Sequence, residues 1–437
     1  MSRYLQAAAI AVLLLLCVSV SVAQDAQPTG NLTVWMQRAN QDQLENTVLP
    51  AFLEAYPGIT VEFVNYSPQE TAQQLAIAIQ GGAGAPDVAL MESNQVPRLL
   101  QLGGLSDLTD RIGADASDFN QLALSLGQQG DRLYAVPWDT GPVVLYYRRD
   151  IFEAAGLPSD PESVDALVAT WEDFQNVCQQ ILDITGLQCF ADNRARSYGD
   201  LWLNLLYSAN LGWFNDDGSL AFTSPEHVAL LELEGKFWDA NLTSDELEWT
   251  DNWYASLNET ELSGAAVPPV ATIPIAAWMG GFLKNWAAVD TAGQWGVVRF
   301  PAVDADAIRS ANMGGSSYTI PEMSQNKDAA WAFINFVNST ASQVELLRFG
   351  DVFPARLSAY DDPIFDETDP YFADQNVRAV YAEAARTMPV PNMNGPYYPL
   401  MKSTLATAVQ QYATETLSAQ DALNQAADVI RAETGLQ

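Results

Sequence analysis

The amino-acid sequence predicts an α/β fold in which helices flank a mostly parallel sheet, and three observations lead to this prediction. The chain has 437 residues, which is enough for two to three domains. Hydrophobic residues make up 48% of it and charged residues 17%, a balance that allows a sizeable core. Short β-prone runs alternate with helical patterns near the start of the chain, and this alternation favours parallel strands connected by helices.

Residues 1–23 contain no acidic residue and are expected to form a secretory signal peptide. A short basic start precedes an apolar run over 7–18, and small residues follow it, so cleavage is expected after Ala23. The alternative is a membrane anchor, but the run is shorter than the roughly 20 residues that a bilayer span requires. Because Leu16 precedes Cys17, where a lipoprotein signal carries a small residue, we expect a free periplasmic protein.

Strands and helices alternate in the next part of the chain. We expect, in order, a strand over 31–36, a helix over 40–56, a strand over 59–64, a helix over 71–80 and a strand over 86–91. A Pro-Gly pair ends the first of these helices, and a Gly-Gly pair ends the second. Ligands of parallel sheets bind beyond the carboxyl ends of the strands, so the residues after the first and third strands are candidates for a binding site.

A second unit is expected to start after Pro137. It opens with a strand-like run over 143–147, and Thr170 with Asp173 forms a capping box at the start of a helix. Two helices are expected to close the chain, the second of them capped by Ser418. The sequence contains no internal repeat and no low-complexity tract.

The charges and the rarer residue types exclude several classes of function. The chain has 54 acidic and 20 basic residues, and nucleic acids and anionic membranes need a basic surface, so neither is an expected partner. His227 is the only histidine, which excludes a multi-histidine metal site; neither a metal nor a cofactor is expected. Cys178 and Cys189 are 11 residues apart in an exported chain and are expected to form a disulfide, with two buried thiols as the alternative.

Several short motifs, in their order along the chain, point to a known family. They are GAPDV at 84–88, LGGLSDLTD at 102–110, RLYAVPWD at 132–139, VLYYRRDIF at 144–152, AGL at 155–157, TWEDF at 170–174, NMGG at 312–315 and KDAAWAFI at 327–334. Together they resemble the motifs of bacterial extracellular solute-binding proteins of the carbohydrate ABC-importer type (family 1, maltose-binding-protein-like). The resemblance extends from about Leu32 to Arg431, and it is poor over 238–295.

The resemblance implies a two-lobed periplasmic-binding-protein fold in which each lobe has a mostly parallel sheet flanked by helices and a hinge joins the lobes. Its boundaries would be 30–138 and 299–350 for the N-terminal lobe, and 142–296 and 354–437 for the C-terminal lobe. The chain would cross between the lobes near 139–142, 297–299 and 350–353. It also implies a monomer whose lobes close around a sugar and then dock on the membrane permease subunits of an ABC importer.

A sugar has apolar C–H faces and a rim of hydroxyl groups, so its site needs aromatic rings and side chains that make paired hydrogen bonds. Residues of these kinds lie after strands, at the expected crossings or at positions that resemble the family's motifs, and two glycines are added because they let the backbone approach a ligand. The candidate ligand-binding residues are Trp35, Gln37, Arg38, Glu92, Asn94, Trp138, Asp139, Trp202, Trp278, Gly314, Gly315 and Arg356. For Trp35 the alternative is packing between sheet and helix, and for the polar residues it is a loop or surface role.

The expected function is therefore the high-affinity capture of a sugar or oligosaccharide and its delivery to the permease, without enzymatic activity. One alternative keeps the fold but binds a polyamine or another small polar solute, for which Glu92, Asp139 and Trp35 would suit. A secreted glycoside hydrolase is an alternative of a different class. It needs two carboxylates about 5–10 Å apart, but the sequence has neither eight βα units nor a sandwich pattern.

Overall fold

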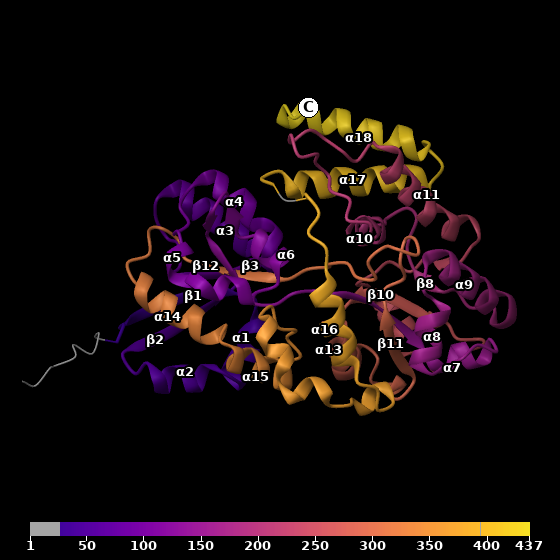
Figure 1. Cartoon of the computed structure of the whole chain (residues 1–437), viewed down its shortest axis with the longest axis horizontal. Coiled ribbons are helices and arrows are strands. Elements are labelled where there is room, and N and C mark those ends of the chain that lie inside the picture. Colours follow the sequence, from indigo (N-terminus) through magenta and orange to yellow (C-terminus); the bar gives the residue numbers. More distant parts are fainter. Residues whose placement is uncertain (1–26, 394) are drawn as a thin grey trace, which may run out of the picture.

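The structure is a computed structural model that describes residues 27–393 and 395–437, and these form two lobes side by side (Figure 1). The signal peptide predicted over 1–23 lies outside the described residues, as does its cleavage site. Each lobe holds a β-sheet with helices around it, and the two C-terminal helices, yellow in Figure 1, lie on the side of the second lobe. The predicted α/β class and the two lobes are confirmed. Within the described residues, no helix is long and apolar enough to span a bilayer.

The first lobe is built on a five-stranded sheet of order β2-β1-β3-β12-β6. Its strands are β1 (Gly30–Met36), β2 (Ile59–Asn65), β3 (Val88–Glu92), β6 (Ala135–Pro137) and β12 (Ser316–Thr319). Strand β1 pairs in parallel with β2 and β3, whereas β12 is antiparallel to both β3 and β6. The three strands predicted over 31–36, 59–64 and 86–91 are confirmed, and a strand from far along the chain completes the sheet.

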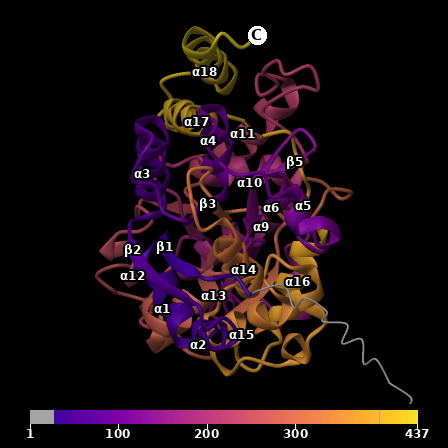
Figure 2. The same cartoon turned by 90° about the vertical axis from the view of Figure 1, so that its left-hand side faces the viewer.

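Helices cover both faces of this sheet. They are α1 (Arg38–Asn46), α2 (Leu49–Ala55), α3 (Pro68–Gly81), α4 (Val96–Leu102), α5 (Thr109–Ile112), α6 (Gln121–Ser125), α14 (Lys327–Val337) and α15 (Thr340–Gly350), with a hairpin of β4 (Gln128–Gln129) and β5 (Arg132–Leu133). The late helices α14 and α15 pack against the early helices α2 and α1 (Figure 2). The single helix predicted over 40–56 is two helices, because Pro50 has no N–H group and its ring would clash with the carbonyl of Asn46.

The second lobe has a three-stranded sheet with β7 (Val143–Arg148) between β10 (Thr272–Ala276) and β11 (Trp295–Arg299). Both outer strands are antiparallel to β7, so the prediction of a mostly parallel sheet in each lobe is wrong for this lobe. Whether two neighbouring strands run parallel or antiparallel depends on which segments of the chain pair with each other. Here both partners come from more than 120 residues further along the chain, and the local alternation of strands and helices carries no information about their direction.

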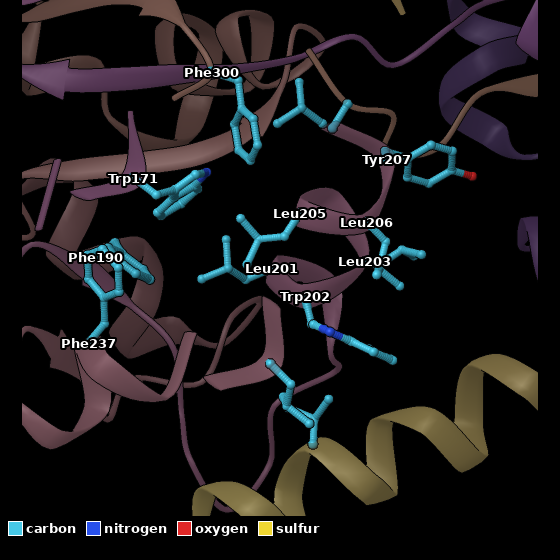
Figure 3. Packing of buried hydrophobic residues seen from close by; sticks show 14 of the residues in the cluster. Trp171, Phe190, Leu201, Trp202, Leu203, Leu205, Leu206, Tyr207, Phe237 and Phe300 are labelled. Carbon is cyan, nitrogen blue, oxygen red and sulfur yellow. The ribbon is translucent and has the colours of Figure 1, made fainter. Parts of the chain in front are cut away.

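The second lobe contains most of the helices. They are α7 (Arg149–Ala154), α8 (Pro161–Leu167), α9 (Trp171–Thr185), α10 (Asp200–Ser208), α11 (Pro225–Asp239), α12 (Asp251–Asn258), α13 (Met279–Phe282), α16 (Val377–Thr387), α17 (Tyr398–Ala413) and α18 (Ala419–Thr434), with a short pair of β8 (Phe190–Ala191) and β9 (Thr243–Ser244). Figure 3 shows part of its core, in which aromatic rings from α9, α11 and β8 lie on one side of α10. Strands and helices distant in sequence thus share one hydrophobic interior.

Local predictions for this lobe are confirmed. Cys178 in the middle of α9 and Cys189 before β8 form the predicted disulfide. On the chain-entropy model, closing so short a loop contributes about 2–3 kcal/mol to stability. The capping box of Thr170 and Asp173 is present at the start of α9. His227 is buried, and its ring contacts the Ser224 hydroxyl at 2.9 Å, which is a structural role.

Three segments run between the lobes and lie next to one another. Asp139 pairs with Pro354, and Pro142 pairs with Asn312. Gly141 is needed here because a Cβ atom at this position would collide with the carbonyl oxygen of Met313. The crossing expected at 297–299 is misplaced: these residues lie within β11, and the chain continues in the second lobe's core as far as Ala311. The lobe boundaries themselves stay predictions.

Candidate functional site

A cavity of about 720 Å³ lies beside the crossing segments and is lined by residues of both lobes. On one side it receives the carboxyl ends of β1 and β3, where ligands of parallel sheets bind. On the other side it receives α10, α13 and the start of α17. We call this cavity the cleft.

Most of the residues that the sequence singled out line the cleft. They are Gln37, Glu92, Asn94, Trp138, Asp139, Trp278, Gly314 and Gly315. The two glycines have φ angles of 90° and 101°, in the left-handed region that favours glycine. The backbone carbonyl of Gly315 accepts a hydrogen bond from the Ser93 amide, which joins the crossing segment to the end of β3.

Two candidates beside the first strand do not line the cleft. Trp35 is buried under α3 and α4, where its ring meets that of Tyr66 at 5.2 Å. Successive strand residues face opposite sides of the sheet, so Trp35 and its neighbour Met36 belong to different cores. Arg38 is mostly exposed and forms an ion pair with Asp42 one turn later on α1, at 2.7 Å.

Two further candidates belong to the interior. Trp202 lies on the side of α10 that faces the C-terminal helices, and its indole N–H donates to the carbonyl of His227 (Figure 3). Arg356 is buried, donates to Asp118 at 3.0 Å and lies 4.6 Å above the ring of Phe119. Both side chains are satisfied by the fold, so neither is available to a ligand in the cleft.

The wall of the cleft contributed by the first lobe carries side-chain amides; we call it the amide wall. Its residues are Gln37, Asn40, Gln43, Gln69 and Asn94. Neighbours hold these groups in place: Gln37 donates to Asn40 at 2.9 Å, and Gln43 donates to the carbonyl of Gly350 at 2.8 Å. The amide wall therefore presents donors and acceptors with fixed directions.

The opposite wall carries a row of aromatic rings, which we call the aromatic wall. It consists of Trp249, Trp278, Phe282 and Trp286, with centroids of successive rings 5.8, 5.7 and 5.4 Å apart. Trp249, Phe282 and Trp286 are 39%, 38% and 51% exposed, although large aromatic rings are usually buried. The indole N–H of Trp278 donates to the carbonyl of Met313 at 3.0 Å and so orients its ring.

Sequence reasoning found only Trp278 in this row. The other rings lie in the segment where the resemblance to the family is poor. A usable signal was present, because Trp278, Phe282 and Trp286 recur every fourth residue and therefore share one face of the helical segment formed by α13 and the π-helical turn Leu283–Ala287. Trp249 comes from a loop and carries no such signal.

Charged groups occupy the floor of the cleft. Burial raises the pKa of Glu92, and it raises the pKa of Asp139 to about 6 even though Asp139 accepts a hydrogen bond from the Ser316 amide. The Lys402 ammonium pairs with the Asp200 carboxylate at 3.0 Å. Burial lowers the pKa of Lys402, but the carboxylates of Asp200 and Glu92 outweigh this effect and raise it. Sequence reasoning missed both Asp200 and Lys402.

The edge of the cleft is closed by contacts between helices of the two lobes. Asp351, which follows α15, pairs with Lys284 at 2.6 Å and accepts a hydrogen bond from Asn285 at 3.0 Å. Within residues 27–393 and 395–437, no group of three or more His, Cys, Asp or Glu side chains is arranged to hold a metal ion.

A family model and known relatives match this chain over most of its length. Residues 31–344 match the family model of the bacterial extracellular solute-binding proteins. The lactose-binding protein of Rhizobium radiobacter is 26% identical over 411 residues, which cover 92% of this chain and 90% of the relative. An arabinooligosaccharide-binding protein of Halalkalibacterium halodurans is 23% identical, covering 94% and 91%.

Solved structures share the fold. An extracellular solute-binding protein of family 1 superposes with a TM-score of 0.77 at 19% identity, covering 92% of this chain and 99% of the other. An ABC-transporter-associated binding protein from B. animalis subsp. lactis, solved with β-1,6-galactobiose, superposes with a TM-score of 0.74 at 22% identity, covering 93% and 99%.

Proposed function

The chain belongs to the family of bacterial extracellular solute-binding proteins, and from this premise we propose that it captures a sugar or oligosaccharide and delivers it to the permease of an ABC importer. The observation that carries the proposal is the pairing of the amide wall with the aromatic wall across one cleft. Aromatic rings stack on the apolar faces of a sugar, and amides form directed hydrogen bonds with its hydroxyl groups.

The spacing of the rings supports an oligosaccharide in particular. A row with centroids 5.4 to 5.8 Å apart offers several successive stacking surfaces, whereas a monosaccharide would occupy only one or two of them. Curated relatives that cover most of the chain have names that state lactose, arabinooligosaccharide or maltooligosaccharide as the bound solute. These relatives are binding proteins, and we propose that this chain likewise binds its sugar without altering it.

In the proposed cycle the two lobes close on the ligand by rotation about the crossing segments. A ligand shifts this equilibrium only by its difference in affinity for the open and closed states, so it has to contact both walls. We propose that the lobes divide as the resemblance implies, with the second crossing moved to about 312–315. The protein would act as a monomer, released into the periplasm after cleavage behind Ala23.

Thermal unfolding of the purified protein against neutral mono- and oligosaccharides, polyamines and amino acids tests the proposal. A ligand that binds only the folded state stabilises it by about 2.7 kcal/mol at a hundredfold excess over its Kd. We expect an oligosaccharide to raise the Tm and to be recovered chemically intact. A polyamine or amino acid as the sole stabiliser would refute the sugar assignment, and cleavage of the oligosaccharide would refute the binding-protein assignment.

A further inference from the structure

The cleft contains four carboxylates but one basic group. Glu92, Asp139, Asp200 and Asp351 line it, and Lys402 is the basic residue among the described lining residues. An anionic sugar, such as a uronate or a sugar phosphate, needs an Arg or Lys that is free to pair with its negative charge. The chance of binding such a ligand therefore rests on whether Lys402 is available.

Lys402 is already engaged. Its ammonium group lies 3.0 Å from the carboxylate of Asp200, and this is the ion pair that the structure gives it. Asp200 stands in the first turn of α10, where the helix dipole favours a negative charge. An incoming carboxylate or phosphate would have to displace Asp200 or share its cation.

Cations elsewhere near the cleft are equally occupied. Lys284 is held by Asp351 and Asp369, at 2.6 and 3.4 Å. Arg38 pairs with Asp42 outside the cleft, and Arg356 is buried. The protein as a whole carries a net charge of −34, which repels anionic ligands at long range.

We infer, on the basis of the proposed function, that Asp200 is a specificity-determining residue: by pairing with Lys402 it restricts the cleft to uncharged sugars and excludes uronates and sugar phosphates. The relatives include an sn-glycerol-3-phosphate-binding protein, so the family does not by itself impose an uncharged ligand. The pair of Asp200 and Lys402 decides the charge class in this chain.

The test compares affinities for neutral and acidic sugars of one shape, measured by titration calorimetry on the wild type and Asp200→Asn. The probes are galactobiose with digalacturonate, and glucose with glucose 6-phosphate. In the wild type we expect the acidic member of a pair to bind at least a hundredfold more weakly than the neutral member. Asp200→Asn keeps the shape of the side chain but frees Lys402, so it is expected to bind the acidic member at least tenfold more tightly.

Asp328→Asn is the matched control. Asp328 also lies in the first turn of a helix and forms an ion pair, with Arg111 at 2.7 Å, but it is exposed on α14 and does not line the cleft. This variant removes the same charge and is expected to keep the wild-type discrimination. An equal gain in Asp328→Asn would attribute the effect to net charge and overturn the role of Asp200.

The wild-type comparison of neutral and acidic sugars keeps the inference testable if Asp200→Asn does not fold. If Asp200→Asn folds, adding Lys402→Met to it is expected to abolish the tenfold gain. The inference fails if the wild type binds an acidic sugar within tenfold of its neutral partner. If no sugar binds the folded wild type, neither these probes nor any member of the thermal-unfolding panel, the proposed function itself fails, and this outcome is distinct because discrimination is then never observed.

Discussion

The amide wall and the aromatic wall of the cleft are held in place by different kinds of structure. The amide wall lies at the carboxyl ends of β1 and β3 and on the helices beside them, where backbone hydrogen bonds determine each position. The aromatic wall lies on a loop, a short helix and a π-helical turn, and three of its rings are substantially exposed. Under the proposed function, this difference teaches that directed hydrogen bonds and apolar contact area come from separate parts of the cleft: the fixed amides would select the hydroxyl geometry, and the exposed rings would supply the apolar contact area.

The largest expected effect comes from the centre of the aromatic wall. Trp278→Ala removes a stacking ring together with its hydrogen bond to the Met313 carbonyl, so we expect the affinity for an oligosaccharide to fall by about 2–3 kcal/mol. Trp278→Phe keeps a ring but not the N–H group and should lose less. Calorimetry with both variants would contradict the stacking role if they lost affinity equally.

The next effect concerns Asp139, which lies between the two walls. Burial raises its pKa to about 6, so the folded state binds this proton more tightly than the unfolded state does. Its contribution to stability is therefore full at acidic pH below its unfolded pKa and is lost as the pH rises through 6. Between pH 4 and pH 7 the wild type should lose about 2 kcal/mol relative to Asp139→Asn, whose amide oxygen can still accept from Ser316.

Urea unfolding of both proteins across this pH range measures that difference directly. In both proteins the side-chain oxygen of residue 139 accepts the hydrogen bond from the Ser316 amide, so the comparison isolates the titration of one carboxyl group. A difference between the two proteins that stays constant from pH 4 to pH 7 would show that Asp139 titrates as an ordinary exposed carboxylate.

A single position on the amide wall is expected to contribute less than the central ring. Gln37→Ala removes one hydrogen-bonding group, and a neutral hydrogen bond contributes about 1 kcal/mol, so affinity should fall roughly fivefold. Gln179→Ala on the outside of α9 is the control and should leave the affinity unchanged. A larger loss of affinity in Gln37→Ala than in Trp278→Ala would contradict the expectation that the aromatic wall contributes more to affinity than the amide wall does.

The smallest effect is expected at the outer end of the aromatic wall. Trp286 is 51% exposed, so it can contact only a ligand long enough to reach it. Trp286→Ala should weaken binding of a longer oligosaccharide by about 0.5 kcal/mol and leave a disaccharide unaffected. Equal losses for both lengths would mean that the ring supports its neighbours Tyr254 and Phe282 instead of the ligand.

The sequence allowed two of the five residues of the amide wall, Gln37 and Asn94, to be predicted, but only one of the four rings of the aromatic wall. Gln37, Glu92 and Asn94 follow strands whose ends could be located from hydrophobic runs, and the sheet then brings them together. Trp35 takes the alternative that the sequence left open, packing between sheet and helix, because one residue along a strand changes the face of the sheet. Asp200 and Lys402 are about 200 residues apart, and only packing of α17 beside α10 makes them a pair.

The sequence by itself determined the α/β class, the first strands, the disulfide and the helix caps, because each depends on residues close together in the chain. The tertiary structure alone decided the antiparallel sheet of the second lobe, the assignment of Trp202 and Arg356 to the interior, and the pairing that occupies Lys402. These features depend on which distant segments pack together. That choice is made by burial of the whole chain, which no local pattern records.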